Sequence, residues 1–337
     1  MSVGLVIEPQ RANVAPDSND FAAASWTTSG TVTVPSTTEV SPRVDVADAS
    51  RVQAAAGSNY RYRAGSGYTP GTVFTASRWT APYTPPADIG LPVGTSGAGS
   101  SSGFDLAPGA TGWKRLAAQA TVGVGGVLWS FVVDSRAMST IVAGARDWLV
   151  NAMQIEVGKW ESEYIPTSGG GGGATRGGTR CVVQASRWSR LGALGRVNVG
   201  ISFRAKCARA DIEGTPYLLH TYDQVSAFFD PATGVLTLRD MPQATNTCTL
   251  PAWAKYDRVR LLIAFGNGVA SSVKYSLNGG VTVSLAITGS PLGAVWSGNT
   301  AYPLFAFNSN NPNTGQVPAW GYEVHVYPPT LVPSWAA

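Results

Sequence analysis

Short runs in which apolar and polar residues alternate recur about every 8 to 15 residues, separated by glycine, proline, serine and asparagine. Such alternation places every second side chain on the same face of a β-strand, whereas a helix would need apolar residues three and four apart. The clearest case is residues 273–277, followed by Asn278-Gly279-Gly280 and then residues 281–287. Because Asn-Gly favours the positive φ angles of a type I′ turn, this segment predicts a β-hairpin.

Three further segments carry strand patterns, and a fourth is ambiguous. Residues 201–206 and 322–327 alternate, and residues 258–265 form a nearly continuous apolar run that predicts a central strand. Residues 138–153 look helical at first, but Gly144 interrupts them and their second half alternates, so we interpret that half as a strand. The chain is therefore predicted to be all-β, with its strands stacked as β-sandwiches.

A glycine-rich segment in the middle of the chain marks a domain boundary. Residues 169–173 are all glycine, and two more glycines follow shortly afterwards. Glycine runs lack the side chains that a sandwich strand packs, and they behave as flexible tethers. The sequence thus predicts one sandwich in residues 1–167, a Gly-rich linker in residues 168–180 and a second sandwich in residues 181–337.

Charged residues make up only 13% of the chain, and the formal net charge is +4 with the basic residues scattered. Nucleic-acid binding needs a basic stripe and is therefore not expected. No segment approaches the roughly 18 apolar residues of a membrane span, and the N-terminus carries no signal-peptide pattern, so membrane insertion and general secretion are not expected. The surface must be covered by neutral polar residues, a composition that suits contact with sugars.

The three cysteines, Cys181, Cys207 and Cys248, show no C-x-x-C spacing, so a zinc site is not expected. Reduced thiols, as in a protein folded inside a bacterial cytoplasm, are the preferred interpretation. Whether Cys207 and Cys248 pair stays open, because it depends on whether their strands are neighbours.

Motifs near both ends of the predicted first sandwich resemble one known module. The segments are G-L-V-I-E-P-Q-R-A-N at 4–13, Phe21, Trp26, W-K-R at 113–115, M-Q-I-E-V-G at 153–158, Y-I-P-T-S-G at 164–169 and A-T-R at 174–176. They are similar to the opening and closing signatures of a carbohydrate-binding-module-like jelly roll found in many phage tail, fibre and decoration proteins.

The second half resembles the concanavalin A-like (laminin-G-like) jelly roll that commonly follows that module. The Asn278-Gly279 hairpin is similar to a hairpin of that family, and the segment from Trp320 through Leu331 is similar to its closing strand. Glu323-Val324-His325 departs from the usual Ile-Arg-Arg of this strand, on the face expected to meet solvent.

The resemblance implies two tandem jelly-roll sandwiches in a phage structural protein, either a decoration protein or a fibre or spike component. Its expected partners are other virion proteins of capsid or tail, with host-surface polysaccharide as a further partner. We expect it to be made in the bacterial cytoplasm, to reside in the virion and to form a homo-oligomer, a trimer or a pentamer. A polysaccharide depolymerase, either a hydrolase or a lyase, is the alternative.

Catalytic residues are not expected. Glycoside hydrolysis needs two carboxylates across a cleft, but Glu156 of the Glu156, Glu161 and Glu163 cluster belongs to the closing signature. His220 lies near Asp223, yet no G-x-S-x-G motif supplies a nucleophile. The remaining acids considered are scattered singly in loops and turns: Asp211, Glu213, Asp223 and Asp230. His325 lies on an alternating strand and should face solvent.

Aromatic and asparagine side chains in loops are the candidates for contact with a glycan or with a neighbouring protein chain, and both interpretations stay open. The candidates are Trp79, Tyr83, Trp296, Tyr302, Asn308, Asn310, Asn311 and Trp320. Trp26, Trp113 and Trp148 lie in strand-like contexts and are expected in the core. Neutral oxygens bind calcium weakly, so an Asn-rich turn is preferred over a calcium site, and no cofactor is expected.

Overall fold

A computed structural model of the chain divides into two compact units, which we describe separately. The N-terminal sandwich comprises residues 11–176, and the C-terminal sandwich comprises the described residues from 181 onward. The structure describes residues 11–15, 17–42, 49–162, 164–165, 167, 174–176, 181–183, 196–221, 225–240, 245–266, 271–289, 304–306, 317–327 and 331–336.

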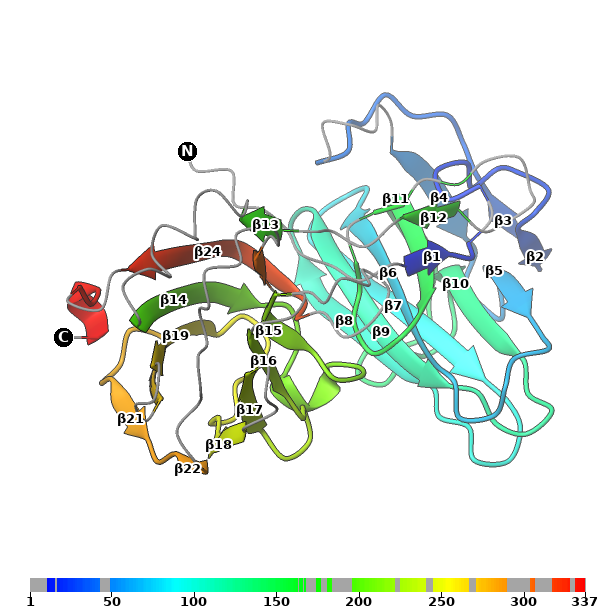
Figure 1. Cartoon of the computed structure of the whole chain (residues 1–337). Helices are drawn as coiled ribbons and strands as arrows, with labels where there is room; N and C mark the ends of the chain where they lie inside the picture. Colours follow the sequence, from blue (N-terminus) through cyan, green and yellow to red (C-terminus); the bar gives the residue numbers. More distant parts are fainter. Residues whose placement is uncertain are drawn as a thin grey trace. The chain divides into compact units, whose positions relative to one another are not determined.

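Two five-stranded antiparallel sheets form the N-terminal sandwich (Figure 1). In order across the first sheet, the strands are β2 (Thr27–Ser29), β5 (Tyr60–Gly65), β10 (Leu128–Asp134), β7 (Ala87–Thr95) and β8 (Gly103–Ala110). In order across the second, they are β3 (Val32–Thr33), β4 (Ser50–Ala54), β11 (Arg146–Val157), β6 (Val73–Pro82) and β9 (Lys114–Thr121).

From β4 to β11 the chain crosses between these sheets in jelly-roll order. Strands β4, β6, β9 and β11 lie in one sheet and β5, β7, β8 and β10 in the other. Their inward side chains form one core that includes Phe74, Leu91 and Trp148. Trp26 belongs to the same core, so the predicted core positions of Trp26 and Trp148 are confirmed, whereas Trp113 is only half-buried and packs against a smaller buried cluster.

Arg78 crosses the interior of the N-terminal sandwich from one sheet to the other. It lies on β6, is fully buried, and donates hydrogen bonds to the carbonyls of Phe131 and Gly90 over 2.6 Å and to that of Val132. A bulge between Phe131 and Val133 interrupts the β10–β5 ladder, so these β10 carbonyls can accept from the guanidinium. Burial lowers the pKa of Arg78 to about 9.

A two-stranded sheet ties together the two ends of the N-terminal sandwich. In it, β1 (Arg11–Asn13) pairs with β12 (Ala174–Arg176). The prediction of a linker over 168–180 is therefore corrected for these three β12 residues, because backbone pairing with β1 holds them and needs no large side chains. The buried Asn13 reinforces this closure by accepting a hydrogen bond from the Ile155 N–H over 2.9 Å.

The C-terminal sandwich contains a seven-stranded and a five-stranded antiparallel sheet (Figure 1). In order across the larger sheet, the strands are β13 (Cys181–Val183), β23 (Leu304–Ala306), β15 (Tyr217–Thr221), β16 (Val225–Phe229), β17 (Val235–Asp240), β18 (Thr245–Thr249) and β22 (Thr288–Gly289). In order across the smaller sheet, they are β21 (Val283–Leu285), β20 (Ser272–Leu277), β19 (Arg258–Gly266), β14 (Arg196–Ala205) and β24 (Ala319–Tyr327).

Strand predictions in this half are largely confirmed. The apolar run at 258–265 is β19, which lies between β20 and β14, and the alternating runs at 201–206 and 322–327 fall largely in β14 and β24. In the N-terminal sandwich, the helix-like segment 138–153 has no helix and its second half is the start of β11, as expected.

The Asn278-Gly279 turn is also confirmed. Both residues have positive φ, 52° and 76°, and the Gly280 N–H donates to the Leu277 carbonyl over 2.8 Å. The second arm of the hairpin is shorter than predicted, because only β21 pairs with β20 and the rest of 281–287 lies outside that strand.

Among the described residues the only helices are two single 3₁₀ turns, η1 (Arg209–Asp211) and η2 (Ser334–Ala336), which confirms the all-β fold class. In this described part, no helix has the length and apolar character needed to cross a membrane. Cys207 and Cys248 are buried thiols and form no disulfide with each other, and burial raises the pKa of Cys248 to about 11.

Candidate functional site

A cleft lined by aromatic rings lies on the outer face of the β2-β5-β10-β7-β8 sheet. We call it the aromatic cleft; its volume is ≈ 380 Å³, and its lining includes Gly94, Phe104, Trp129, Phe131 and Arg136. Phe104 is 49% exposed, Trp129 is half-buried and Phe131 is nearly buried. Apolar surface that stays open beside a few polar groups is typical of ligand sites.

Strand alternation places the two central rings in this cleft. Along β10, Leu128 lies in the core, whereas Trp129 and Phe131 line the cleft on the opposite face. Gly94 lies directly opposite Trp129 on the neighbouring strand β7. A Cβ atom at Gly94 would lie 3.5 Å from Phe131 and 3.6 Å from Trp129, so the absence of a side chain leaves open floor beside the rings.

Two tyrosines of β5 extend the aromatic surface around Phe131. The ring centroid of Phe131 lies 5.7 Å from that of Tyr60 and 5.8 Å from that of Tyr62. These separations are typical of edge-to-face and tilted aromatic pairs, which hold one another in fixed orientations. The aromatic surface is therefore supported by neighbouring rings and is ordered before any ligand arrives.

An ion pair fixes the polar group of the cleft. Arg136 donates through Nε to Asp134 Oδ1 over 2.9 Å and through Nη2 to Oδ2 over 2.6 Å. Its guanidinium lies 4.2 Å from the ring centroid of Tyr60 and 5.0 Å from that of Phe131. The hydrogen bond to Asp134 raises the pKa of Arg136, so the cation is retained at any physiological pH.

This arrangement presents an apolar aromatic surface with one oriented hydrogen-bond donor, the Arg136 guanidinium, at its edge. Within the described part of the chain, Nη1 of Arg136 donates no hydrogen bond, so it is open to an acceptor in the cleft. The Asp134 carboxylate is buried and both of its oxygens accept from Arg136, which makes it a support for that side chain. The cleft is thus built to hold a ring with one apolar face and a polar edge.

Two of the predicted contact residues lie elsewhere in the N-terminal sandwich. Trp79 is half-buried on β6, in the other sheet, opposite Asn151. Tyr83 follows β6 and is 37% exposed, and the Arg51 guanidinium lies 3.6 Å from its ring centroid. Neither residue lines the aromatic cleft, and contact of either with a glycan or a neighbouring chain stays a prediction.

The other predicted contact residues are less completely described. Trp320 lies on β24 opposite Arg204. Five others fall outside the described residues and stay predictions: Trp296, Tyr302, Asn308, Asn310 and Asn311. The Asn-rich turn and the alternative of a calcium site there also stay predictions. His325 is exposed, as its alternating strand predicted.

Glu156 of the closing signature is fixed in a buried network. Its carboxylate accepts hydrogen bonds from the Ser162 N–H over 2.8 Å and from Gln154 Nε2 over 2.6 Å. Burial raises its pKa, although these hydrogen bonds act against the shift. In the C-terminal sandwich, Asp230 accepts from the Ala232 N–H and the Thr233 hydroxyl within a turn, where the Thr233 hydrogen bond lowers its pKa. Both acids therefore stabilise local structure.

The sequence criterion favoured aromatic rings in loops and so missed Trp129, Phe131 and Arg136. A signal was present, because Leu128-Trp129-Ser130-Phe131 alternates and puts both rings on one face of a strand. Which face is open could not be seen, since Gly94 and Phe104 come from strands that are distant along the chain.

Comparisons with known proteins leave the family open. No family model and no curated protein matches the chain. Among solved structures, the chain is similar to "Mouse laminin alpha1 chain, domains LG4-5" at 9% sequence identity, with 83% of this chain and 90% of that chain covered and a TM-score of 0.26. A likeness this weak carries no conclusion, and the fold described above rests on the strand order itself.

Proposed function

We propose that this chain is a non-enzymatic glycan-binding protein and that the aromatic cleft holds a sugar ring. The observation that carries the proposal is the open surface of Phe104 and Trp129 beside Nη1 of Arg136, which donates to no acceptor among the described residues. The C–H face of a pyranose packs on aromatic rings, and its hydroxyls accept hydrogen bonds from a guanidinium. A chain with few charges and many neutral polar residues is suited to the same ligand.

A binding role is preferred over a depolymerase because of how two acids of the N-terminal sandwich are used, Asp134 in the cleft and Glu156 in the other sheet. The Asp134 carboxylate is taken up by Arg136, and Glu156 lies in a buried network with Ser162 and Gln154. Hydrolysis by paired carboxylates would need one acid and one base facing the bound sugar. The geometry of the cleft offers stacking and orientation to a ligand instead.

A phage particle is the setting that we propose for this binding. Support comes from the sequence motifs at 153–158 and 164–169, which resemble those of phage virion modules; in the structure the Ile165 N–H of the second motif donates to Gln154 Oε1 of the first over 2.7 Å. In this proposal the chain resides in the virion as a trimer or pentamer bound to capsid or tail proteins and contacts host-surface polysaccharide. Mass spectrometry of purified particles and light scattering of the isolated chain test it; a monomer absent from particles would contradict it.

The cleft is tested by removing one of its rings. Trp129→Ala should weaken binding to host capsule or lipopolysaccharide by about tenfold, since a stacked ring contributes on the order of 1 kcal/mol or more. Tyr256→Ala is the control, because Tyr256 is an exposed ring that is not a predicted contact residue and lies outside the aromatic cleft. Affinity is measured by isothermal titration, and thermal melts establish that both variants fold.

Two results would overturn the cleft proposal. One is equal affinity of the wild type and Trp129→Ala for the same glycan. The other is release of new reducing ends during incubation, which would favour the depolymerase alternative.

A further inference from the structure

A second polar site lies on the C-terminal sandwich, on the outer face of the β21-β20-β19-β14-β24 sheet. Strand register places its side chains: Ser202 of β14 is opposite Arg260 of β19 on one side and Glu323 of β24 on the other. Gly200 is opposite His325 in the same way. Ile201, between them, is buried on the inner face, as strand alternation requires.

The segment 331–336 covers one side of this face. Asn198 Nδ2 donates to the Leu331 carbonyl over 2.9 Å, and Lys274 Nζ donates to the Ala336 carbonyl. The Thr282 hydroxyl donates to the carbonyl of Trp335. These contacts from three separate parts of the sandwich hold the segment on the sheet.

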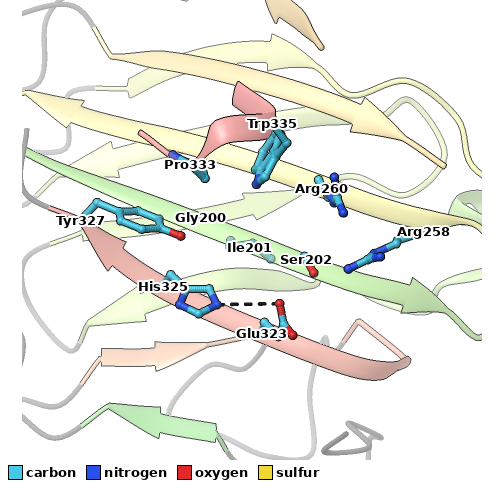
Figure 2. Close-up of a pocket in the computed structure, with 10 residues that line it drawn as sticks. All are labelled: Gly200, Ile201, Ser202, Arg258, Arg260, Glu323, His325, Tyr327, Pro333 and Trp335. Carbon is cyan, nitrogen blue, oxygen red and sulfur yellow. Dashed lines mark ion pairs between the residues drawn. The ribbon is translucent and has the colours of Figure 1, made fainter. Parts of the chain in front are cut away.

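The segment and β24 enclose a groove, which we call the β24 groove. Its volume is ≈ 180 Å³, and Trp335 and Pro333 form one wall while His325 and Tyr327 form the other (Figure 2). The floor is β14, where Gly200 lies under the Tyr327 ring (Figure 2). A Cβ atom at Gly200 would lie 2.9 Å from Tyr327 Cε2, so a larger residue there would displace this wall.

Arginines give the groove its charge. Arg258 and Arg260 line it, and among the described residues neither side chain has a carboxylate within ion-pair distance. The Arg260 guanidinium lies 5.9 Å from the Trp335 ring centroid, which keeps it beside the aromatic wall. The acid of the groove, Glu323, lies 3.8 Å from His325 on the far wall. Two guanidiniums thus outweigh one carboxylate at this site.

We infer that the β24 groove binds a monoanionic sugar residue, one that carries a carboxylate or a sulfate ester. Arg258 and Arg260 offer the planar donor pairs that recognise such oxyanions, and the Trp335 and Tyr327 rings pack against the sugar ring. Glu323 borders the site and disfavours a doubly charged phosphate. Pockets for drug-sized ligands begin at roughly 300 Å³. The β24 groove, at ≈ 180 Å³, is smaller and suits one sugar unit within a longer chain.

This site is independent of the aromatic cleft, because it uses no residue of the N-terminal sandwich. It is also distinct in ligand chemistry, since Arg136 of the cleft is already neutralised by Asp134, whereas the groove arginines have no such carboxylate among the described residues. The chain could then hold one acidic polysaccharide or two different glycans at two places.

The test titrates the full chain with three polymers at low, fixed ionic strength: polygalacturonate, dextran sulfate and neutral dextran. At least one of the two anionic polymers should bind, and the pair shows whether a carboxylate or a sulfate ester is preferred. Arg260→Gln should weaken that binding by at least about tenfold, because it removes the planar cation at the aromatic wall. Arg63→Gln removes one exposed positive charge elsewhere and should change affinity by less than about twofold.

Several outcomes would overturn the inference. Failure of both anionic polymers to bind is one, and equal affinity of Arg260→Gln and the wild type is another. An equal loss in Arg63→Gln and Arg260→Gln would mean that binding follows overall charge and not the groove. Formation of unsaturated sugar ends, followed by ultraviolet absorbance, would make the groove a lyase site instead of a binding site. Thermal melts establish that both variants are folded.

Discussion

Two arginines of the N-terminal sandwich, Arg78 and Arg61, are built into the fold, whereas two arginines of the β24 groove in the C-terminal sandwich face outward. Arg78 is fully buried and bonds to backbone carbonyls of the facing sheet, and the nearly buried Arg61 donates to the Phe21 carbonyl over 2.6 Å. Arg258 and Arg260 line an open groove, and among the described residues no carboxylate lies within ion-pair distance of either.

The difference separates two uses of the same side chain. Removing a guanidinium from water costs several kcal/mol, and a fold retains it only where many hydrogen bonds offset that cost. Burial lowers the pKa of both Arg78 and Arg61, which is the direction expected when loss of water disfavours the charged form of the side chain. An arginine on an outer sheet face has little desolvation to offset, so it contributes little to stability and is available to a ligand.

The largest expected effect tests this contrast directly. Arg78→Met should destabilise the N-terminal sandwich by about 3–5 kcal/mol, because it leaves the carbonyls of Gly90, Phe131 and Val132 buried without a donor. Arg260→Met, on the outer face of the other sandwich, should change stability by less than about 1 kcal/mol. Urea unfolding of both full-length variants gives the two free energies.

A similar loss in both variants would show that the contrast between the two sandwiches is wrong. Arg78→Lys is a useful intermediate, because it keeps a positive charge but has fewer donors in a different geometry. It should fall between the wild type and Arg78→Met. If the Arg78→Lys variant matched the wild type, the charge and not the set of carbonyl bonds would account for the role of Arg78.

Much of the fold could be predicted because its signals are local. Alternation over six residues predicted β14 and β24, a nearly continuous apolar run predicted β19, and Asn278-Gly279 predicted its turn from two residues. The closing motif at 153–158 coincides with the end of β11, where the side chains of Gln154 and Glu156 bond to Ser162. Each of these features depends on neighbours within about ten residues.

Features that depend on distant pairing could not be predicted. β12 was predicted to be part of the flexible linker, because the strand with which it pairs, β1, lies at the other end of the sequence that forms this sandwich. The carbonyls of Phe131 and Val132 that accept from Arg78 lie at a bulge in β10, a strand of the facing sheet. The aromatic cleft needs Trp129 to lie opposite Gly94, and no property of either residue alone indicates that register.

The selection of contact residues, which stays a prediction, overlooked the aromatic cleft for a related physical reason. Loop position was taken as a sign of exposure, which is right for Tyr83 at 37% exposed. Strands on the outer face of a sandwich also expose their side chains, and there the rings of neighbouring strands can form a continuous surface. Phe104, on β8, is more exposed than Tyr83 although it lies within a strand.

The smallest expected effect is a difference in how stability depends on pH within the N-terminal sandwich. It compares two enclosed acids of β11. Burial raises the pKa of Glu156 in spite of its hydrogen bonds. Burial acts the same way on Asp147, but hydrogen bonds from Arg51 and Gln53 outweigh it and lower the pKa of that carboxyl. The two acids should therefore respond to pH in opposite directions.

The signs follow from proton linkage, with unfolded pKa values of about 4.3 for Glu and 3.9 for Asp. The stabilising contribution of Glu156 is fully present below its unfolded pKa and is lost as pH rises through its raised folded pKa. That of Asp147 is present above its unfolded pKa and is lost as pH falls through its lowered folded pKa. Glu156→Gln should thus cost more stability at about pH 3 than at about pH 7, and Asp147→Asn should cost more at about pH 7. Denaturant unfolding at both pH values measures the two costs, and costs that changed in the same direction would show that burial does not dominate at Glu156.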